Sequence, residues 1–278
     1  MCSVPAVPAA DRPFAVMGVL NVTPDSFSDG GEWFGRDAAV THGLELVRDG
    51  AAIVDVGGES TRPGALPVPQ DEELRRTVPV VEALARSGAT ISIDTSKPAV
   101  ARAALDAGAT YVNDVTALRG DPAMAALVAE RGATCCLMHM RGEPRTMQQD
   151  PRYDDVVAEV KGFLEDRVAF AVGEGIAEDR IHLDPGIGFG KALEHNLELL
   201  RRLDELAELG FPLVVGTSRK SFISKLTGAP DARSRLPGTL ATCVMALERG
   251  ARIFRVHDVA ETAQALTVAA ATLRGDGA

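Results

Sequence analysis

The chain has 278 residues, of which 46% are hydrophobic and 24% are charged, which is ordinary globular composition with enough length for one large core. Its net charge of −10 argues against general binding to nucleic acids or anionic membranes, but leaves room for a small basic site that takes an anionic substrate. The first residues lack the basic and apolar regions of a signal peptide, and no apolar run approaches ~18 residues, so we expect a cytoplasmic protein.

Short apolar runs rich in β-branched residues recur along the chain, and each closes on polar residues. Near-continuous apolar runs are typical of parallel strands that are covered on both faces. The polar residues that close the runs lie, in chain order, at Asn21, 55–60, Asp94, 113–114, His139, Asp184, 216–220 and 255–258.

Helical periodicity fills the segments between these runs. Pro98 and Pro122 are predicted in first turns, with Asp121 as an N-cap, while Gly108 and Gly132 follow the ends of their helices. The predicted helices span 37–50, 71–88, 97–108, 121–132, 154–174, 195–209, 236–249 and 259–273.

The chain has four cysteines and no CxxC spacing, so we expect buried, reduced thiols. Cys135 and Cys136 are adjacent in an apolar run, and on a strand they would point to opposite faces.

The alternation of eight strands with helices predicts an α/β fold of the (β/α)8 TIM-like barrel type. A doubly wound open sheet is the alternative. In a barrel the carboxyl ends of all strands meet at one mouth, which would explain why nearly every run ends on a polar residue. No linker composition divides the chain, so one barrel domain is expected at 13–278, after a flexible extension at 1–12.

Asp94, Asn113 and Asp184 follow three different predicted strands. Each alone could simply start a turn or cap a helix. Together at one barrel mouth they would supply acceptor and donor atoms suited to a flat heterocycle with adjacent N–H and NH2 groups. A buried carboxylate without such a partner would be costly.

Basic residues follow the last two predicted strands. Arg219 and Lys220 open a helix, where the helix dipole disfavours cations, so they are better explained as ligands for an anion or an acceptor than as a solvated helix start. Arg255 and His257 are two residues apart and would share one face of a strand, as in a phosphate clamp, unless they form a surface pair.

Other histidines and two long loops complete the candidate features. His139 lies between Met138 and Met140, which suits either a core position or a ring sandwich; His42, His182 and His195 are interpreted as structural. The glycine-flanked loops "NVTPDSFSDGG" and "GGESTRPGA" are typical of lids at a catalytic face. Neither loop is a nucleotide P-loop, and the sequence holds no zinc-ligand pattern.

Several long motifs resemble one enzyme family, the dihydropteroate synthases. They are "MGVLNVTPDSFSDGG", "DVGGESTRPGA", "SIDTSKP", "NDVTAL", "LMHMRGEPRTMQ", "LDPGIGFGK", "GTSRKSFI" and "RVHDV", and the similarity runs from Met17 to the C-terminus. The resemblance implies a homodimeric transferase with a TIM-like barrel. It would join 6-hydroxymethyl-7,8-dihydropterin diphosphate to 4-aminobenzoate, giving 7,8-dihydropteroate and diphosphate, and sulfonamides would compete with 4-aminobenzoate.

The resemblance also implies roles for individual residues. Those implied for the pterin diphosphate are Asn21, Thr61, Asp94, Asn113, Met138, Asp184, Gly216, Lys220, Arg255 and His257. Those implied for 4-aminobenzoate are Phe27, Arg62, Pro63, Phe189, Lys220 and Ser221. Those implied for catalysis are Asp29, Arg62, Lys220, Arg255 and His257, with Mg2+ bridging the diphosphate and Asn21.

The implied chemistry is an SN1-like departure of diphosphate, which needs charge stabilisation and shielding from water more than a strong base. A pterin-dependent methyltransferase and a pterin-binding paralogue without synthase activity are the alternative functions. The methyltransferase would have little use for "SRKS" and "RVHD" beside a diphosphate.

Overall fold

The computed structural model describes residues 13–23, 31–60, 65–143 and 146–275, with the backbone alone for 31–34. The extension expected at 1–12 lies outside the described residues.

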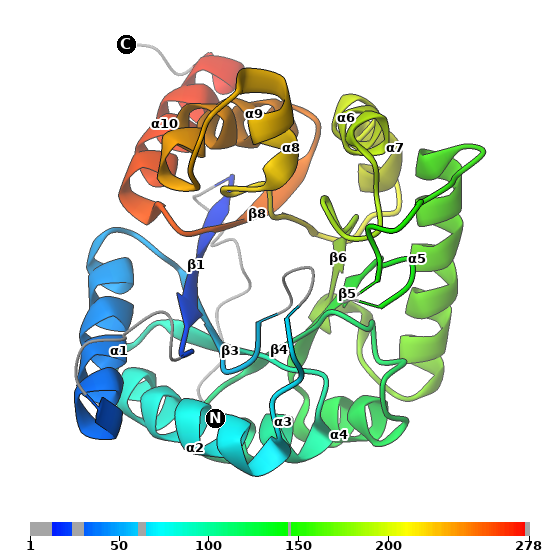
Figure 1. Ribbon diagram of the computed structural model, residues 1–278. Helices are drawn as coiled ribbons and strands as arrows, with labels where there is room; N and C mark the ends of the chain where they lie inside the picture. The colour runs from blue at the N-terminus through cyan, green and yellow to red at the C-terminus, as the bar shows by residue number, and fades with distance from the viewer. Residues whose placement is uncertain (1–12, 24–30, 61–64, 144–145, 276–278) are drawn as a thin grey trace.

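Eight parallel strands pair in chain order and close into a barrel, with the last strand beside the first (Figure 1). The strands are β1 (Ala15–Asn21), β2 (Ile53–Gly57), β3 (Thr90–Asp94), β4 (Tyr111–Asp114), β5 (Thr134–Met138), β6 (Ile181–Asp184), β7 (Leu213–Val215) and β8 (Ala251–Val256). The closed order confirms the predicted (β/α)8 barrel and excludes the doubly wound open sheet.

Helices ring the barrel in the described part of the chain (Figure 1). They are α1 (Gly31–Arg48), α2 (Gln70–Leu84), α3 (Pro98–Asp106), α4 (Ala123–Arg131), α5 (Val156–Gly173), α6 (Leu193–Arg201), α7 (Asp204–Ala207), α8 (Ser221–Thr227), α9 (Leu236–Glu248) and α10 (Val259–Arg274).

Three predicted helices differ clearly from the observed ones. The helix predicted at 71–88 ends at Leu84 and is followed by a 3-10 helix at Ala85–Ser87. Helix α1 begins at Gly31, earlier than predicted. The helix predicted at 195–209 is two helices, α6 and α7, because the backbone leaves helical geometry at Arg202, and Leu203 is fully buried beside this break.

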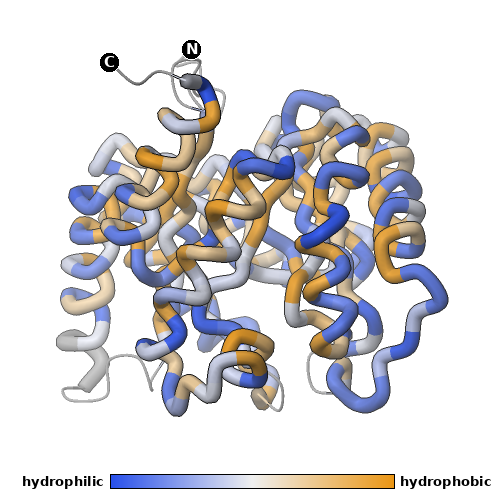
Figure 2. Tube along the Cα trace, turned by 90° about the horizontal axis from the view of Figure 1, so that it is seen from above, coloured by the Kyte–Doolittle hydropathy of each residue, from blue (hydrophilic) through white to orange (hydrophobic). Residues whose placement is uncertain are grey.

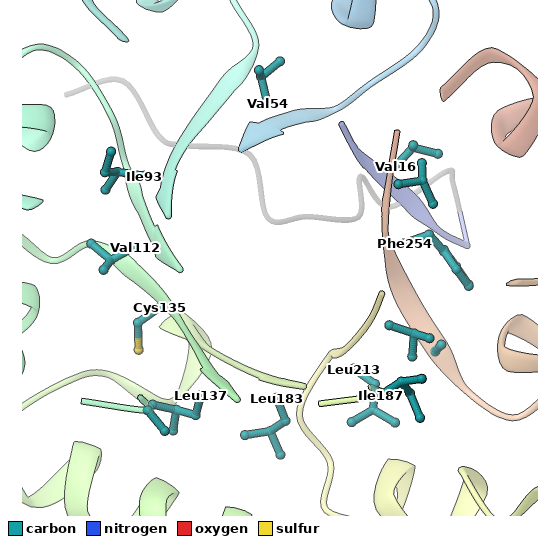
Figure 3. Close-up of a cluster of buried hydrophobic side chains, with 14 of the residues drawn as sticks. Val16, Val54, Ile93, Val112, Cys135, Leu137, Leu183, Ile187, Leu213 and Phe254 are labelled. Carbon is teal, nitrogen blue, oxygen red and sulfur yellow. The ribbon is translucent and has the colours of Figure 1, made fainter. Parts of the chain in front are cut away.

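The outer faces of the strands pack against the helices. Figure 3 shows Val16, Val54, Ile93, Val112 and Cys135 among the buried side chains of this layer. Seen from above, apolar and polar stretches alternate along the chain (Figure 2), as expected of helices with one buried face. Within the described residues, no helix is long and apolar enough to cross a membrane.

The barrel interior is apolar at one level and polar at the next. Its apolar cluster consists of Ala15, Met17, Ile53, Tyr111, Cys136, Val214 and Ile253. Cys135 therefore faces the helices and Cys136 the interior, which confirms the alternation predicted for this pair. Further along the strands the inward positions turn polar. The fold thereby creates a polar mouth above an apolar floor.

Candidate active site

The carboxyl ends of neighbouring strands stand at one level of the barrel mouth. Asn21 of β1 pairs with Gly57 of β2, which pairs in turn with Asp94 of β3, and Asp94 pairs with Asn113 of β4. Residues that pair at the same level of neighbouring strands point to the same face of the sheet, so these side chains all point into the barrel mouth. The structure thus brings three of the predicted polar residues to one place.

Asp55 of β2 joins these strand ends into one hydrogen-bonded network. Its Oδ2 accepts from Arg255 Nε at 2.7 Å and from Asn113 Nδ2 at 3.0 Å. Its Oδ1 accepts from the Ser92 hydroxyl at 2.6 Å. Arg255 also donates from Nη2 to Asp94 Oδ2 at 2.7 Å. One fully buried carboxylate therefore fixes groups from three other strands.

The charges of this network oppose the effect of burial. Burial raises the pKa of Asp94 to about 7, although Arg255 acts to lower it. Burial also disfavours the charged form of Arg255, yet Asp55 and Asp94 hold its pKa above the ordinary value. Arg255 is therefore cationic, while Asp94 titrates near neutral pH.

The network also settles which atoms are left for a ligand. A carboxylate only accepts hydrogen bonds, so Asn113 must turn its NH2 group toward Asp55. Within the described residues, no hydrogen bond is made by Asn113 Oδ1, Asp94 Oδ1 or Asp184 Oδ2. The donor that we expected Asn113 to offer is taken, and three acceptor oxygens suit a heterocycle edge that presents N–H groups.

Asp184 ends β6, beside Met138 of β5. Its Oδ1 accepts from the Gly186 backbone N–H at 2.7 Å, and burial raises the pKa of its carboxyl against the opposing charge of Lys220. Gly186 has a φ of +67°, and a Cβ there would lie 1.8 Å from the His139 carbonyl oxygen. Only glycine therefore allows the β6–α6 loop to cover the end of β5 this closely.

Lys220 and Phe189 meet between the β6–α6 and β7–α8 loops. The Lys220 ammonium donates to the Ile187 carbonyl and lies 4.6 Å from the centre of the Phe189 ring, as in a cation–π contact. Burial lowers the pKa of Lys220 to about 8, although Asp184 acts to raise it. A Cβ at Gly188 would lie 2.9 Å from Lys220 Cδ, so this glycine makes room for the lysine stem.

The ends of β7 and β8 are joined by Ser218. Its hydroxyl accepts from the His257 backbone N–H at 3.1 Å and lies 2.9 Å from His257 Nδ1. Arg219 behaves differently from the expectation that it binds an anion or an acceptor on a ligand. It forms a bidentate ion pair with Asp258, in which Nε lies 3.0 Å from Oδ2, so this guanidinium binds a carboxylate of the protein itself.

Three further predicted residues lie near Lys220 or on the inner face of β5. Gly216 follows β7, and a Cβ there would lie 3.8 Å from Lys220 Nζ. Ser221 is exposed and begins α8. Met138 is buried in a cluster with Met140, Met147 and Val115, against which Phe189 packs.

His139 does not share the inward direction of Met138. Its ring packs edge-on against Phe163 of α5 at 4.9 Å and faces Tyr153 at 6.1 Å. Burial lowers its pKa to about 2, so the imidazole is neutral. Of the two interpretations left open for His139, the core position is the observed one.

Five predicted residues lie outside the described residues. They are Phe27 and Asp29 in the β1–α1 loop, and Thr61, Arg62 and Pro63 in the β2–α2 loop. The base of the second loop is described: Lys97 donates to Glu59 and, at 2.5 Å, to the fully buried Glu73 of α2.

A metal ion would find few protein ligands in this mouth. In the part of the chain that the structure describes, no three His, Cys, Asp or Glu side chains are grouped to hold one. Asn21 offers an amide oxygen, a hard ligand of the kind that Mg2+ accepts while it keeps waters and substrate phosphates as its other ligands. The residues therefore fit a divalent ion that is shared with an anionic substrate.

Sequence reasoning missed two residues that organise the mouth. Asp55 and Lys191 are both almost fully buried, with Lys191 2% exposed. Asp55 had a readable signal, since a carboxylate in the middle of the apolar run "AAIVDVGG" needs a buried partner. Lys191 had none, because a lysine after a glycine-rich turn usually faces solvent.

Residues 17–257 match the family of pterin binding enzymes. The dihydropteroate synthase of Escherichia coli (strain K12) is 51% identical over 259 residues, which cover 93% of this chain and 91% of that protein. The chain belongs to the dihydropteroate synthase family. The dihydropteroate synthase of Mycobacterium leprae (strain TN) is 49% identical over 267 residues, 94% of each chain.

Solved structures of dihydropteroate synthases share the fold. The Xanthomonas albilineans enzyme with 4-aminobenzoic acid superposes with a TM-score of 0.89 at 50% identity, over 95% of this chain and 94% of that one. A structure of that enzyme in complex with 7,8-dihydropteroate gives a TM-score of 0.86 at 47% identity over the same shares. The Yersinia pestis enzyme in a sulfonamide drug complex gives 0.89 at 46% identity, over 94% and 95%.

Proposed function

We propose that this chain is a transferase that joins 6-hydroxymethyl-7,8-dihydropterin diphosphate to 4-aminobenzoate. The products are 7,8-dihydropteroate and diphosphate. The observation that carries the proposal is the polar mouth itself. Asp94, Asn113 and Asp184 keep acceptor oxygens for a pterin edge in a chain that is 51% identical to a dihydropteroate synthase.

The pterin ring would bind against the strand ends. Its N–H and NH2 groups would donate to Asp94, Asn113 and Asp184, because each keeps an acceptor oxygen there. Met138 and Arg255 would contact the faces of the ring. Lys220, beside Gly216, would donate to the polar atoms of the ring from its position near Asp184.

The diphosphate would bind at the end of the mouth formed by β1 and β8. The residues proposed for it are Asn21, Arg255 and His257, with Thr61 from the β2–α2 loop. Dihydropteroate synthases use a divalent metal ion, and we propose that here it is Mg2+ held by Asn21. When bound, this ion would neutralise charge on the departing diphosphate. Arg255 supports the same role because its raised pKa keeps it cationic.

The 4-aminobenzoate pocket would lie between the β6–α6 loop and the start of α8. Phe189 and Lys220, 4.6 Å apart, would form one wall, with the substrate carboxylate near Ser221. Phe27, Arg62 and Pro63 would close the pocket from loops that lie outside the described residues.

The reaction would proceed by departure of diphosphate before the amine adds. The dihydropterin ring delocalises positive charge at its CH2 carbon, so the residues proposed for catalysis need to stabilise charge rather than remove a proton. They are Asp29, Arg62, Lys220, Arg255 and His257. The closed loops would exclude water, which otherwise captures the cation.

Diphosphate release on incubation with the pterin diphosphate, 4-aminobenzoate and Mg2+ tests this function. With both substrates present, the synthase releases diphosphate and forms 7,8-dihydropteroate in equal amount. A paralogue without synthase activity binds the pterin and releases none. Methyl transfer from a methyl donor, without diphosphate release, would identify a pterin-dependent methyltransferase instead.

Asp29→Ala tests the proposed contribution of the first loop. If Asp29 stabilises the pterin cation or the closed loop, turnover should fall by about tenfold, or about 1.4 kcal/mol, while the affinity for the pterin diphosphate changes little. Calorimetric binding and single-turnover rates, measured separately, make this distinction. Unchanged turnover would remove Asp29 from the mechanism.

Two wider properties follow from the same proposal. We expect a homodimer in the cytoplasm, formed by one barrel domain at 13–278 with a flexible extension at 1–12. Mass measurement by light scattering tests the dimer, and deletion of 1–12 should leave turnover unchanged.

A further inference from the structure

Lys191 is a buried lysine that the proposed reaction does not use. It follows the glycine-rich turn of the β6–α6 loop and is 2% exposed. A lysine ammonium has three donor hydrogens, and Nζ lies close to three acceptors. They are His139 Nδ1 at 2.9 Å, the Phe189 carbonyl at 3.0 Å and the His139 carbonyl at 3.3 Å.

These acceptors belong to two different parts of the mouth. His139 follows β5, whereas Phe189 stands in the middle of the β6–α6 loop. Burial lowers the pKa of His139, and its neutral imidazole accepts from the lysine at Nδ1 in the tautomer that carries the proton on Nε2. Lys191 therefore ties the loop to the strand end at a point where the backbones are already in close contact.

Glycines allow this contact but do not hold it. A Cβ at Gly186 would lie 1.8 Å from the His139 carbonyl oxygen, and one at Gly190 would lie 2.3 Å from the Arg141 carbonyl oxygen. Small residues permit a close approach, yet their backbone freedom favours neither this loop conformation nor another. A directional contact is needed to select one, and Lys191 provides three.

Phe189 is the side chain whose position depends on this contact. Its carbonyl is bound by Lys191, while its ring packs on the methionine cluster and lies 4.6 Å from the Lys220 ammonium. Burial lowers the pKa of Lys191 well below its ordinary value, so the site is an expensive place for a cation. The three hydrogen bonds of Nζ offset part of the cost of burying this group.

We propose that Lys191 is a positioning residue that fixes Phe189 as the wall of the 4-aminobenzoate pocket. Lys191 does not touch either substrate and acts only through the backbone of Phe189. The inference rests on the proposed function for the identity of the second substrate. It predicts a selective defect toward the aromatic amine rather than a general loss of activity.

Lys191→Met tests the proposal because methionine keeps most of the length of the side chain and removes all three donors. We expect the KM for 4-aminobenzoate to rise by about tenfold or more, while the calorimetric Kd for the pterin diphosphate stays within about twofold. Lys161→Met is the matched control, since Lys161 is a partly exposed lysine of α5 that pairs with Glu208, away from the mouth. It should change neither constant.

A double-mutant cycle with Phe189→Ala separates positioning from general damage. If Lys191 acts through Phe189, Lys191→Met should add little to the KM already raised by Phe189→Ala, within about twofold. A merely structural role would give additive effects, because lost stability does not depend on which side chain forms the wall. Additive effects would overturn the proposal.

Lys191→Gln provides the test if Lys191→Met does not fold. The glutamine amide keeps two donors on a shorter stem, so we expect a smaller rise in the same KM, about threefold, and again no change for the pterin diphosphate. Equal changes for both substrates, or none for 4-aminobenzoate, would contradict the inference. Wild-type protein without synthase turnover would instead contradict the proposed function.

Discussion

The two sides of the mouth are held in different ways. On the strand side, Asp55, Asp94, Asn113 and Arg255 bond to one another through side chains that alternate along β-strands. On the loop side, lysine ammonium groups bond to backbone carbonyls, and glycines let the chain approach closely. On the strand side, the register of the paired strands fixes the positions of the side chains. On the loop side, the conformation depends on a few contacts, each of which a single substitution removes.

Asp55→Ala should have the largest effect on the strand side. It leaves Arg255, Asn113 and Ser92 without their shared acceptor, and removal of one partner from a buried ion pair costs about 3 kcal/mol of the free energy of unfolding. Turnover should fall by about 100-fold, equivalent to about 2.7 kcal/mol. Urea unfolding and steady-state rates measure the two effects.

Ser92→Ala is the matched control for Asp55. It removes one hydrogen bond to the same carboxylate, so we expect a loss of about 1 kcal/mol of stability and nearly unchanged turnover. Equal effects from both substitutions would mean that Asp55 does not organise the mouth.

Gly186→Ala should have the next largest effect, on the loop side. An alanine at this positive φ strains the backbone by about 1 kcal/mol. Its Cβ would also clash with the His139 carbonyl, and overpacking of this kind typically costs about 1–3 kcal/mol. We expect the KM for 4-aminobenzoate to rise with the loss of stability.

Gly228→Ala isolates the backbone part of that effect. Gly228 has a similar φ of +73°, but a Cβ there would have no atom within 4 Å in the described residues. Thermal unfolding should show only the strain of about 1 kcal/mol, with both KM values unchanged. A loss of stability as large as that of Gly186→Ala would show that the contact with His139 is unimportant.

The pH dependence of pterin binding should show a smaller effect. The raised pKa of Asp94, about 7, means that the carboxylate fraction falls from about nine-tenths at pH 8 to about one-tenth at pH 6. Pterin N–H donors need the carboxylate, so affinity should fall by about tenfold over this range. Asp94→Asn should bind more weakly and lose this dependence, which calorimetry at each pH detects.

The free protein should respond to the same group in the opposite sense. Between about pH 4 and 7 the folded state keeps a proton on Asp94 that the unfolded state has lost, so the free energy of unfolding falls as pH rises. A contribution of Asp94 that increased with pH would contradict the raised pKa.

The sequence predicted the strand side better than the loop side. The expectation that strand ends meet at one barrel mouth placed Asp94 and Asn113 side by side, and they pair at the ends of β3 and β4. The hydrogen-bond partners were not predictable in the same way: Asn113 faces Asp55 across β3, a contact that only closure of the barrel defines. Arg219 likewise looked like a ligand for a bound anion until its pairing with Asp258 was visible.

The contacts on the loop side could not be predicted from local sequence patterns, for a physical reason. Lys191 is buried where its own loop meets the backbone carbonyl of His139, which lies 52 residues away in the sequence. Nothing in the neighbouring sequence distinguishes it from a solvated lysine. The break between α6 and α7 was likewise not predicted, because the helical period continues through Arg202, where the backbone leaves helical geometry.

The apolar cluster beneath the polar mouth has a consequence for how substrates reach the site. Met17, Tyr111, Ile253 and their neighbours fill the barrel interior, so a molecule can reach Asp94 and Asn113 only through the barrel mouth. If the pterin binds at Asp94 and Asn113 as proposed, it must enter before 4-aminobenzoate, which would then lie between the pterin and the barrel mouth. Under that proposal, the filled barrel floor alone would impose an order on substrate binding.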